Sequence, residues 1–78
     1  MQPLPLRDLP LGTRARVRAF CGPHTLKNRL LDLGLTGGTS VCGLLAGPSG
    51  DPVAYAIRGA VVALRGEDAA HIIVDPEP

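Results

Sequence analysis

Glycine and proline occur so often in this chain that no helix or strand in it can be long. Ten glycines and eight prolines account for 18 of the 78 residues, and the densest cluster, at residues 47–52, reads Gly-Pro-Ser-Gly-Asp-Pro. Proline lacks the backbone N–H that a helix or sheet needs, and glycine readily adopts the positive φ of a turn, so such clusters end regular elements. The sequence therefore predicts a small fold of short elements joined by tight turns.

Five segments between these breaks have the pattern of short strands. Residues 13–20 alternate polar and apolar side chains, which puts Ala15, Val17 and Ala19 on the inner face of a strand and three arginines on its outer face. The other four strands are expected at residues 39–46, 53–58, 60–65 and 71–75. The turn Arg58-Gly59 separates the middle two, which predicts a hairpin.

One segment is expected to be a helix, and it begins near Thr25 and ends at Gly34. Thr25 is the expected N-cap, and Gly34 is expected to end the helix in the left-handed conformation. Leu26, Leu30 and Leu33 lie within about 60° of one another on a helical wheel, so they predict the buried stripe.

These elements predict a mainly β fold. We expect an antiparallel sheet of about five strands that bends into a small barrel, with one short helix between the first and second strands. Residues 67–70 fit a single helical turn before the last strand. A chain of 78 residues is too short for two domains, so we expect a single domain over residues 1–78, with its core at about residues 6–75.

Charge and aromatic content argue against a nucleic-acid-binding protein. The formal net charge is only +1, and Phe20 and Tyr55 are the only aromatic residues. Residues 1–40 carry six basic and two acidic groups, whereas residues 41–78 carry two basic and five acidic ones, which gives +4 and −3. Folding of one half against the other would neutralise part of this difference.

Nothing in the sequence predicts insertion into a membrane or export. No apolar run approaches the roughly 20 residues of a membrane-spanning helix, and Pro3 and Pro5 do not fit a signal peptide. We therefore expect a cytoplasmic location. Cys21 and Cys42 are then expected to be reduced thiols, although the sequence leaves a disulfide between them open.

The chain shows no catalytic motif. Gly37-Gly38 is not followed by the lysine of a phosphate-binding loop, and Ser49 has no histidine near it in sequence. We expect no enzymatic activity and no cofactor. Weak candidates for metal ligands are Cys21, His24, Cys42 and His71, of which only the first two form a closely spaced pair. A structural site normally uses two such pairs, so we expect no physiological metal site.

Two features are candidates for contact with a partner protein, although for the first the sequence also leaves open a solvated strand face. Arg14, Arg16 and Arg18 form a basic stripe on the outer face of the first strand. On an acidic membrane three arginines contribute only about 3 kcal/mol, which is too little for recruitment. Leu31 lies beside Lys27, away from the apolar stripe of the helix, so it is either covered by a neighbouring segment or left for a partner.

Seven short motifs occur in order along the chain. They are Leu9-Pro10-Leu11-Gly12, Arg29-Leu30-Leu31-Asp32-Leu33-Gly34-Leu35, Gly38-Thr39-Ser40-Val41, Gly47-Pro48-Ser49-Gly50-Asp51-Pro52-Val53, Arg58-Gly59, Ala63-Leu64-Arg65 and Asp68-Ala69-Ala70-His71-Ile72-Ile73-Val74. In this order they resemble the FeoA family of ferrous iron transport accessory proteins, from about Leu6 to Val74. One departure is Gly37-Gly38, where the family usually has Pro-Gly.

The resemblance implies an SH3-like barrel with an inserted helix, in agreement with the strands predicted above. It also implies a small non-enzymatic accessory protein that contacts the cytoplasmic part of FeoB, a membrane ferrous iron transporter with a GTP-binding domain. Lys27 and Leu31 are the residues we expect at that contact, followed by the three arginines of the first strand. The first alternative is a metal-sensing module, which would bind iron or zinc through the four Cys and His candidates. The second is a small nucleic-acid-binding barrel, against which the low net charge and the scarcity of aromatic residues argue. Among partners, the sequence also leaves a weak homo-oligomer open.

Overall fold

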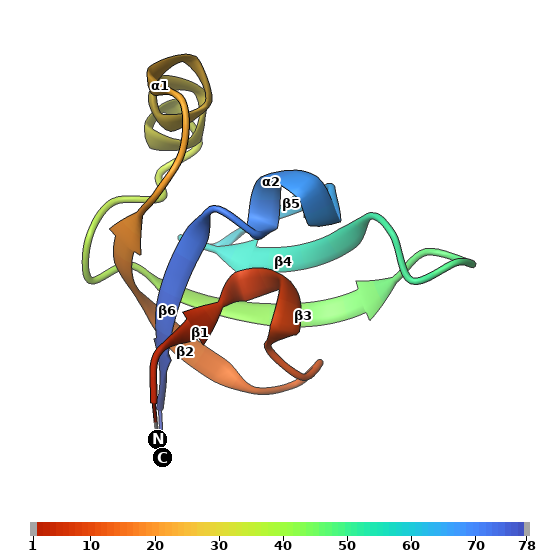
Figure 1. Ribbon diagram of the computed structural model, residues 1–78. Helices are drawn as coiled ribbons and strands as arrows, with labels where there is room; N and C mark the ends of the chain where they lie inside the picture. The colour runs from red at the N-terminus through yellow and green to blue at the C-terminus, as the bar shows by residue number, and fades with distance from the viewer. Residues whose placement is uncertain (1, 78) are drawn as a thin grey trace.

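The computed structural model describes residues 2–77, which form one six-stranded antiparallel sheet and three short helical segments (Figure 1). The strands are β1 (Leu4–Pro5), β2 (Arg14–Phe20), β3 (Ser40–Ala46), β4 (Val53–Ile57), β5 (Ala60–Leu64) and β6 (Ile72–Pro76). The helical segments are η1 (Leu6–Asp8), a 3-10 helix, and the α-helices α1 (His24–Asp32) and α2 (Gly66–Ala69). Among these residues, no helix has the length and apolar composition needed to cross a membrane.

The sheet contains all five predicted strands and one that was not predicted. Its spatial order is β1-β6-β2-β3-β4-β5, and every neighbouring pair is antiparallel. The additional strand, β1, has only two residues, too few to show an alternating pattern, and its Pro5 is tolerated because β1 lies at an edge of the sheet. The other edge strand is β5. Although the sheet curves, within residues 2–77 β1 and β5 are not paired by hydrogen bonds.

The predicted alternation in β2 breaks at Arg18. The register of pairing with β6 shifts between Val17 and Ala19, which makes Arg18 an extra residue in a β-bulge. Ala15 and Val17 are buried, as predicted, but Ala19 is exposed, so that part of the prediction is wrong. Strict alternation of inner and outer side chains assumes that β2 pairs with β6 without interruption. The extra residue of the bulge turns the side chains that follow it to the opposite face of the sheet.

Helix α1 begins one residue earlier than expected. Pro23 occupies the N-cap position with extended backbone angles, and its side chain makes no capping bond, so the prediction that Thr25 caps the helix is wrong. The other end is as predicted. Gly34 has φ +93°, its N–H donates to Leu31 at 2.9 Å, and the N–H of Leu35 donates to Leu30 at 3.0 Å. These two bonds form a Schellman motif, in which the left-handed residue is usually glycine.

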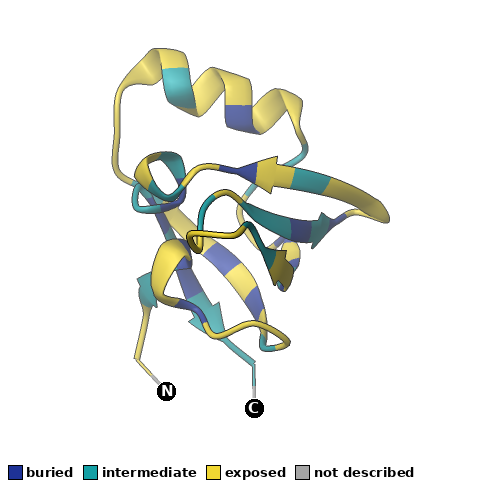
Figure 2. Ribbon diagram, turned by 90° about the vertical axis from the view of Figure 1, so that its right-hand side faces the viewer, coloured by how far each residue is buried: buried dark blue, intermediate teal, exposed yellow. Residues whose placement is uncertain are grey.

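Helix α1 packs lightly on one end of the sheet (Figures 1 and 2). Leu30 is buried and Leu26 half-buried, but Leu33 is 41% exposed because it is the C-cap, beyond the last helical residue. The predicted stripe therefore shortens to Leu26 and Leu30. Most of the surface of α1 remains exposed, as Figure 2 shows.

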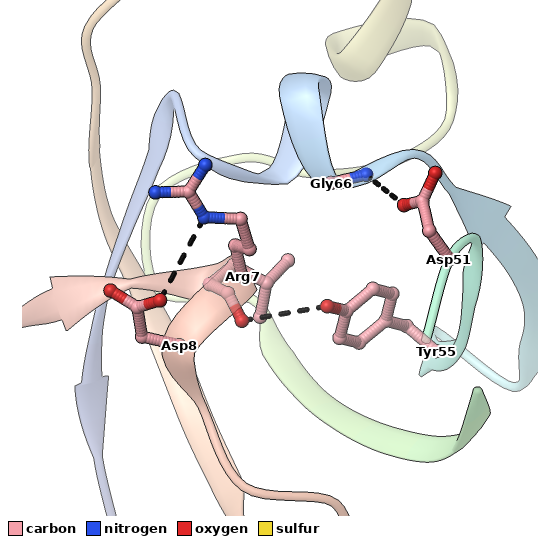
Figure 3. Close-up of polar contacts among 6 residues, drawn as sticks. Arg7, Asp8, Asp51, Tyr55 and Gly66 are labelled. Atoms are coloured by element: carbon pink, nitrogen blue, oxygen red, sulfur yellow. Dashed lines mark hydrogen bonds and ion pairs between the residues drawn. The ribbon is translucent and has the colours of Figure 1, made fainter. Parts of the chain in front are cut away.

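The core lies on the concave side of the curved sheet, and hydrogen bonds link the segments around it. Its largest fully buried side chains are Tyr55, Leu6, Leu30, Ile57, Ile72, Val41 and Val74. The Tyr55 hydroxyl donates to the carbonyl of Leu6 at 3.4 Å, which links β4 to η1 (Figure 3). The carboxylate of Asp51 accepts a hydrogen bond from the backbone N–H of Gly66, at the start of α2 (Figure 3).

Candidate partner-binding surface

A hollow of about 140 Å³ lies between α1 and the end of β2 that leads into it. We call this feature the α1–β2 hollow. Its apolar lining consists of Val17, Ala19, Phe20, Leu30, Leu31 and Leu35, and Gly37 completes the wall. The two remaining lining residues are cations, Arg18 and Lys27, and no carboxylate of residues 2–77 lines the hollow.

The hollow is a direct consequence of the local fold. The bulge in β2 turns Ala19 outward, and its methyl group is too small to fill the space between the strand and the helix. The Schellman motif at Gly34 reverses the chain and returns Leu35 to the core. Buried Leu30 and Leu35 thus lie at the base of the hollow, whereas Leu31 is 41% exposed at its rim.

The structure brings together three of the five residues expected at a partner contact. Lys27, Leu31 and Arg18 all line the α1–β2 hollow. Arg16 and Arg14 do not, because they lie nearer the start of β2. Leu31 lines the hollow together with Leu35 and remains exposed.

Ion pairs to Asp75 of β6 and to Glu77 just after it involve two of the three arginines of the basic stripe. The Nε of Arg16 lies 2.8 Å from a carboxylate oxygen of Glu77, and an Nη of Arg18 lies 3.2 Å from Asp75. Arg16 also donates to the carbonyl of Gly38 at 3.0 Å. The excess of positive charge in the first half of the chain thus meets the excess of negative charge in the second. Lys27, by contrast, forms no ion pair with any residue between positions 2 and 77.

Sequence reasoning missed six lining residues, of which Val17 and Leu30 were expected only in the core; the other four are Ala19, Phe20, Leu35 and Gly37. The signal that could have found two of them is the pair Ala19-Phe20, where two consecutive apolar residues end the alternation of the strand. Such a break in the two-residue period is a sign of a bulge. The contributions of Leu35 and Gly37 depend on the path of the chain after α1, which has no comparable pattern in the sequence.

The four candidate metal ligands do not converge on one point. The Nδ1 of His71 lies 2.7 Å from the carbonyl oxygen of Cys21, so these two residues are neighbours. Cys42 lies on β3 opposite Arg14, which is seven residues before Cys21, a distance of about 20 Å along a strand. Both cysteines are free thiols, and among residues 2–77 no three His, Cys, Asp or Glu side chains lie close enough to share a metal ion.

A family model described as the FeoA domain matches residues 4–76. The solution structure of the FeoA protein from Chlorobium tepidum is 32% identical, with a TM-score of 0.87 over 94% of this chain and 70% of that chain. The crystal structure of Stenotrophomonas maltophilia FeoA complexed with zinc is also 32% identical, with a TM-score of 0.80 over 90% of this chain and 87% of that chain. That protein is described as a prokaryotic SH3 domain protein and proposed as an activating factor of ferrous iron transport.

A third crystal structure, of an iron uptake regulatory protein (FeoA), covers 99% of this chain and 100% of its own, with a TM-score of 0.88. At 23% identity, this likeness shows the fold alone. No curated protein sequence matches the chain with significance. The comparisons confirm the mainly β, SH3-like fold that the sequence predicted.

Proposed function

This chain belongs to the FeoA family, whose members are associated with ferrous iron transport, and on that premise we propose that it modulates a FeoB-type membrane transporter by binding to its cytoplasmic part. In this proposal the protein acts in the cytoplasm, is not an enzyme, and carries no cofactor. Its partner is the transporter protein rather than nucleic acid or lipid.

The observation that supports this proposal is the α1–β2 hollow. Exposed apolar side chains that surround a depression are typical of a protein-binding surface, because burial of a few such residues supplies most of the binding free energy. Leu31 is the large exposed apolar residue that lines this depression. Lys27 and Arg18 lie at the same place and would favour an acidic partner.

The three arginines of β2 contribute unequally to binding in this proposal. Arg18 lines the hollow, whereas Arg16 and Arg14 lie farther from it along the strand. The ion pairs to Asp75 and Glu77 reduce the charge that Arg18 and Arg16 offer to a partner. Leu31 and Lys27 therefore contribute more to binding than the stripe does.

Capture of the protein by the immobilised cytoplasmic part of the FeoB-type transporter from the same genome tests this proposal. We expect Leu31→Asp and Lys27→Glu each to weaken capture about tenfold or more, the effect of losing one strong interface contact. Arg16→Gln is expected to change it less than about threefold, the effect of losing a weak surface charge.

Leu45→Asp is the matched control. Leu45 is 63% exposed on β3 and does not line the hollow, so this variant adds the same charge elsewhere on the surface. If the transporter does not bind the unmodified protein, the proposed function is wrong. If Leu45→Asp weakens capture as much as Leu31→Asp, the binding surface is wrong.

The metal-sensing alternative has less support, because Cys42 is distant from Cys21 and His71.

A further inference from the structure

We propose that the α1–β2 hollow binds one large apolar side chain of an acidic protein segment, with a carboxylate next to that side chain paired to Lys27. The inference rests on the proposed function in that the segment belongs to the transporter. It goes further because it names the chemistry that the surface recognises. The size of the hollow supports the apolar side chain, and the charges around the hollow support the neighbouring carboxylate.

The size of the hollow fits a single side chain. A protein cavity of about 150 Å³ with apolar walls accommodates a benzene ring, and the α1–β2 hollow has about 140 Å³. Buried Leu30, Leu35 and Val17 line it, so a ring or a branched aliphatic group in the hollow would contact apolar side chains. Two large side chains would not fit, which makes this a site for one anchor residue.

The charges around the hollow favour a carboxylate over an amide or an ammonium group. Both charged lining residues are cations, Arg18 and Lys27, and no acidic residue in the described part of the chain lines the hollow. Arg18 already pairs with Asp75 at 3.2 Å. Lys27 has no such partner within residues 2–77, so its ammonium group is the one available to a bound carboxylate.

The first experiment measures binding of small probes to the whole chain, without the transporter. The probes are 3-phenylpropionate, which has a ring and a carboxylate, its neutral amide, and propionate, which has no ring. Amide chemical shifts are followed by NMR during each titration. We expect 3-phenylpropionate to bind with a dissociation constant on the order of millimolar and to shift signals of Ala19, Phe20, Lys27 and Leu31. The amide should bind about two- to fivefold more weakly, as expected for loss of one exposed ion pair, and propionate should not saturate.

Two variants test the two parts of the proposal. Ala19→Phe fills the hollow from an exposed position and is expected to abolish binding of 3-phenylpropionate. Lys27→Gln should make the acid and the amide bind equally. Thermal unfolding of each variant verifies that the fold is retained. Binding outside the hollow, or equal binding of acid and amide to the unmodified protein, would overturn the inference.

Capture of the unmodified protein and of Ala19→Phe by the transporter distinguishes failure of the inference from failure of the proposed function. If 3-phenylpropionate binds in the hollow but the transporter does not capture the protein, the proposed function fails and the hollow still recognises an acidic apolar group. If the transporter captures Ala19→Phe as well as the unmodified protein, the inference fails while the proposed function stands. Competition by 3-phenylpropionate against capture would support both.

Discussion

Arg58 and Gly34, 24 residues apart in sequence, are joined by a hydrogen bond in which the Nε–H of the guanidinium donates to the glycine carbonyl at 3.0 Å. The Nη2 of Arg58 also lies 3.1 Å from the hydroxyl of Thr36. These bonds tie the turn between β4 and β5 to the loop that ends α1. Helix α1 buries only Leu30 fully among the described residues, and the ion pair of Arg29 with Asp68 at 3.0 Å joins it to α2. The bonds of Arg58 therefore act beside these contacts by holding the loop that follows the helix.

Arg58→Asn tests whether these bonds stabilise the loop. Arg58 has φ +50°, a conformation that is unfavourable for most residues but tolerated by asparagine. Asparagine is too short to reach Gly34, so the variant removes the bonds without adding backbone strain. We expect a loss of about 1 kcal/mol in the free energy of unfolding by urea, and faster hydrogen exchange at the amides of Gly34 and Leu35.

Arg65→Gln is the control for Arg58→Asn, because Arg65 is the N-cap residue of α2 and asparagine there would add a favourable cap. The side chain of Arg65 is 68% exposed, and its guanidinium lies 3.8 Å from Asp51. Such a surface pair contributes less than about 0.5 kcal/mol. Equal losses of stability in the two variants would show that Arg58 has no special role.

Gly34→Ala should destabilise the protein, whereas Gly37→Ala should not. Gly34 has φ +93°, and a Cβ added there would lie 2.9 Å from the Cδ of Arg58. At Gly37 the added Cβ meets no described atom within 4 Å, and the backbone has no positive φ. We expect Gly34→Ala to lower the free energy of unfolding by about 1–2 kcal/mol and Gly37→Ala to change it by less than about 0.5 kcal/mol. A neutral Gly34→Ala would contradict the Schellman ending of α1.

The positions of most strands follow from local chemistry and could therefore be predicted. The hairpin at Arg58-Gly59 is an example, because both residues have positive φ and the flanking strands pair without a shift. The end of α1 at Gly34 is another, because only glycine adopts φ +93° at little cost. These features depend on residues close together in the sequence.

The lining of the α1–β2 hollow could be predicted only in part, because it depends on contacts between distant segments. Lys27 and Leu31 were expected at a partner contact from their positions on the helix, and both line the hollow. Ala19 was assigned to the wrong face, since the bulge at Arg18 depends on how β2 pairs with β6 and not on β2 alone. The ion pairs of Arg16 and Arg18 with Glu77 and Asp75 likewise require the sheet order, which the sequence did not specify.

Cys21 and Cys42 should remain independent thiols. Cys21 is exposed and Cys42 half-buried, and their separation of about 20 Å along the sheet is too large for a disulfide, which needs Cα atoms within about 7 Å. We expect iodoacetamide to modify Cys21 faster than Cys42, as measured by mass spectrometry of peptides after proteolytic digestion. Zn²⁺ or anaerobic Fe²⁺ should not slow the modification of Cys42. Protection of both cysteines by the same metal ion would instead support a metal-sensing function.

The stability of the fold should fall at alkaline pH through Tyr55. Burial raises the pKa of Tyr55 above its ordinary value of 10.0, and the negative charge of Asp51 raises it further. As the pH rises through 10.0, the unfolded chain therefore loses the phenolic proton before the folded protein does, which shifts the equilibrium toward unfolding. For one group the loss is at most about 1.4 kcal/mol per pH unit. Urea unfolding at pH 8, 10 and 11 measures this loss, and Tyr55→Phe, which has no phenolic proton to lose, removes it. If the unmodified protein and Tyr55→Phe lose stability equally between pH 10 and 11, the pKa of Tyr55 is not raised by folding.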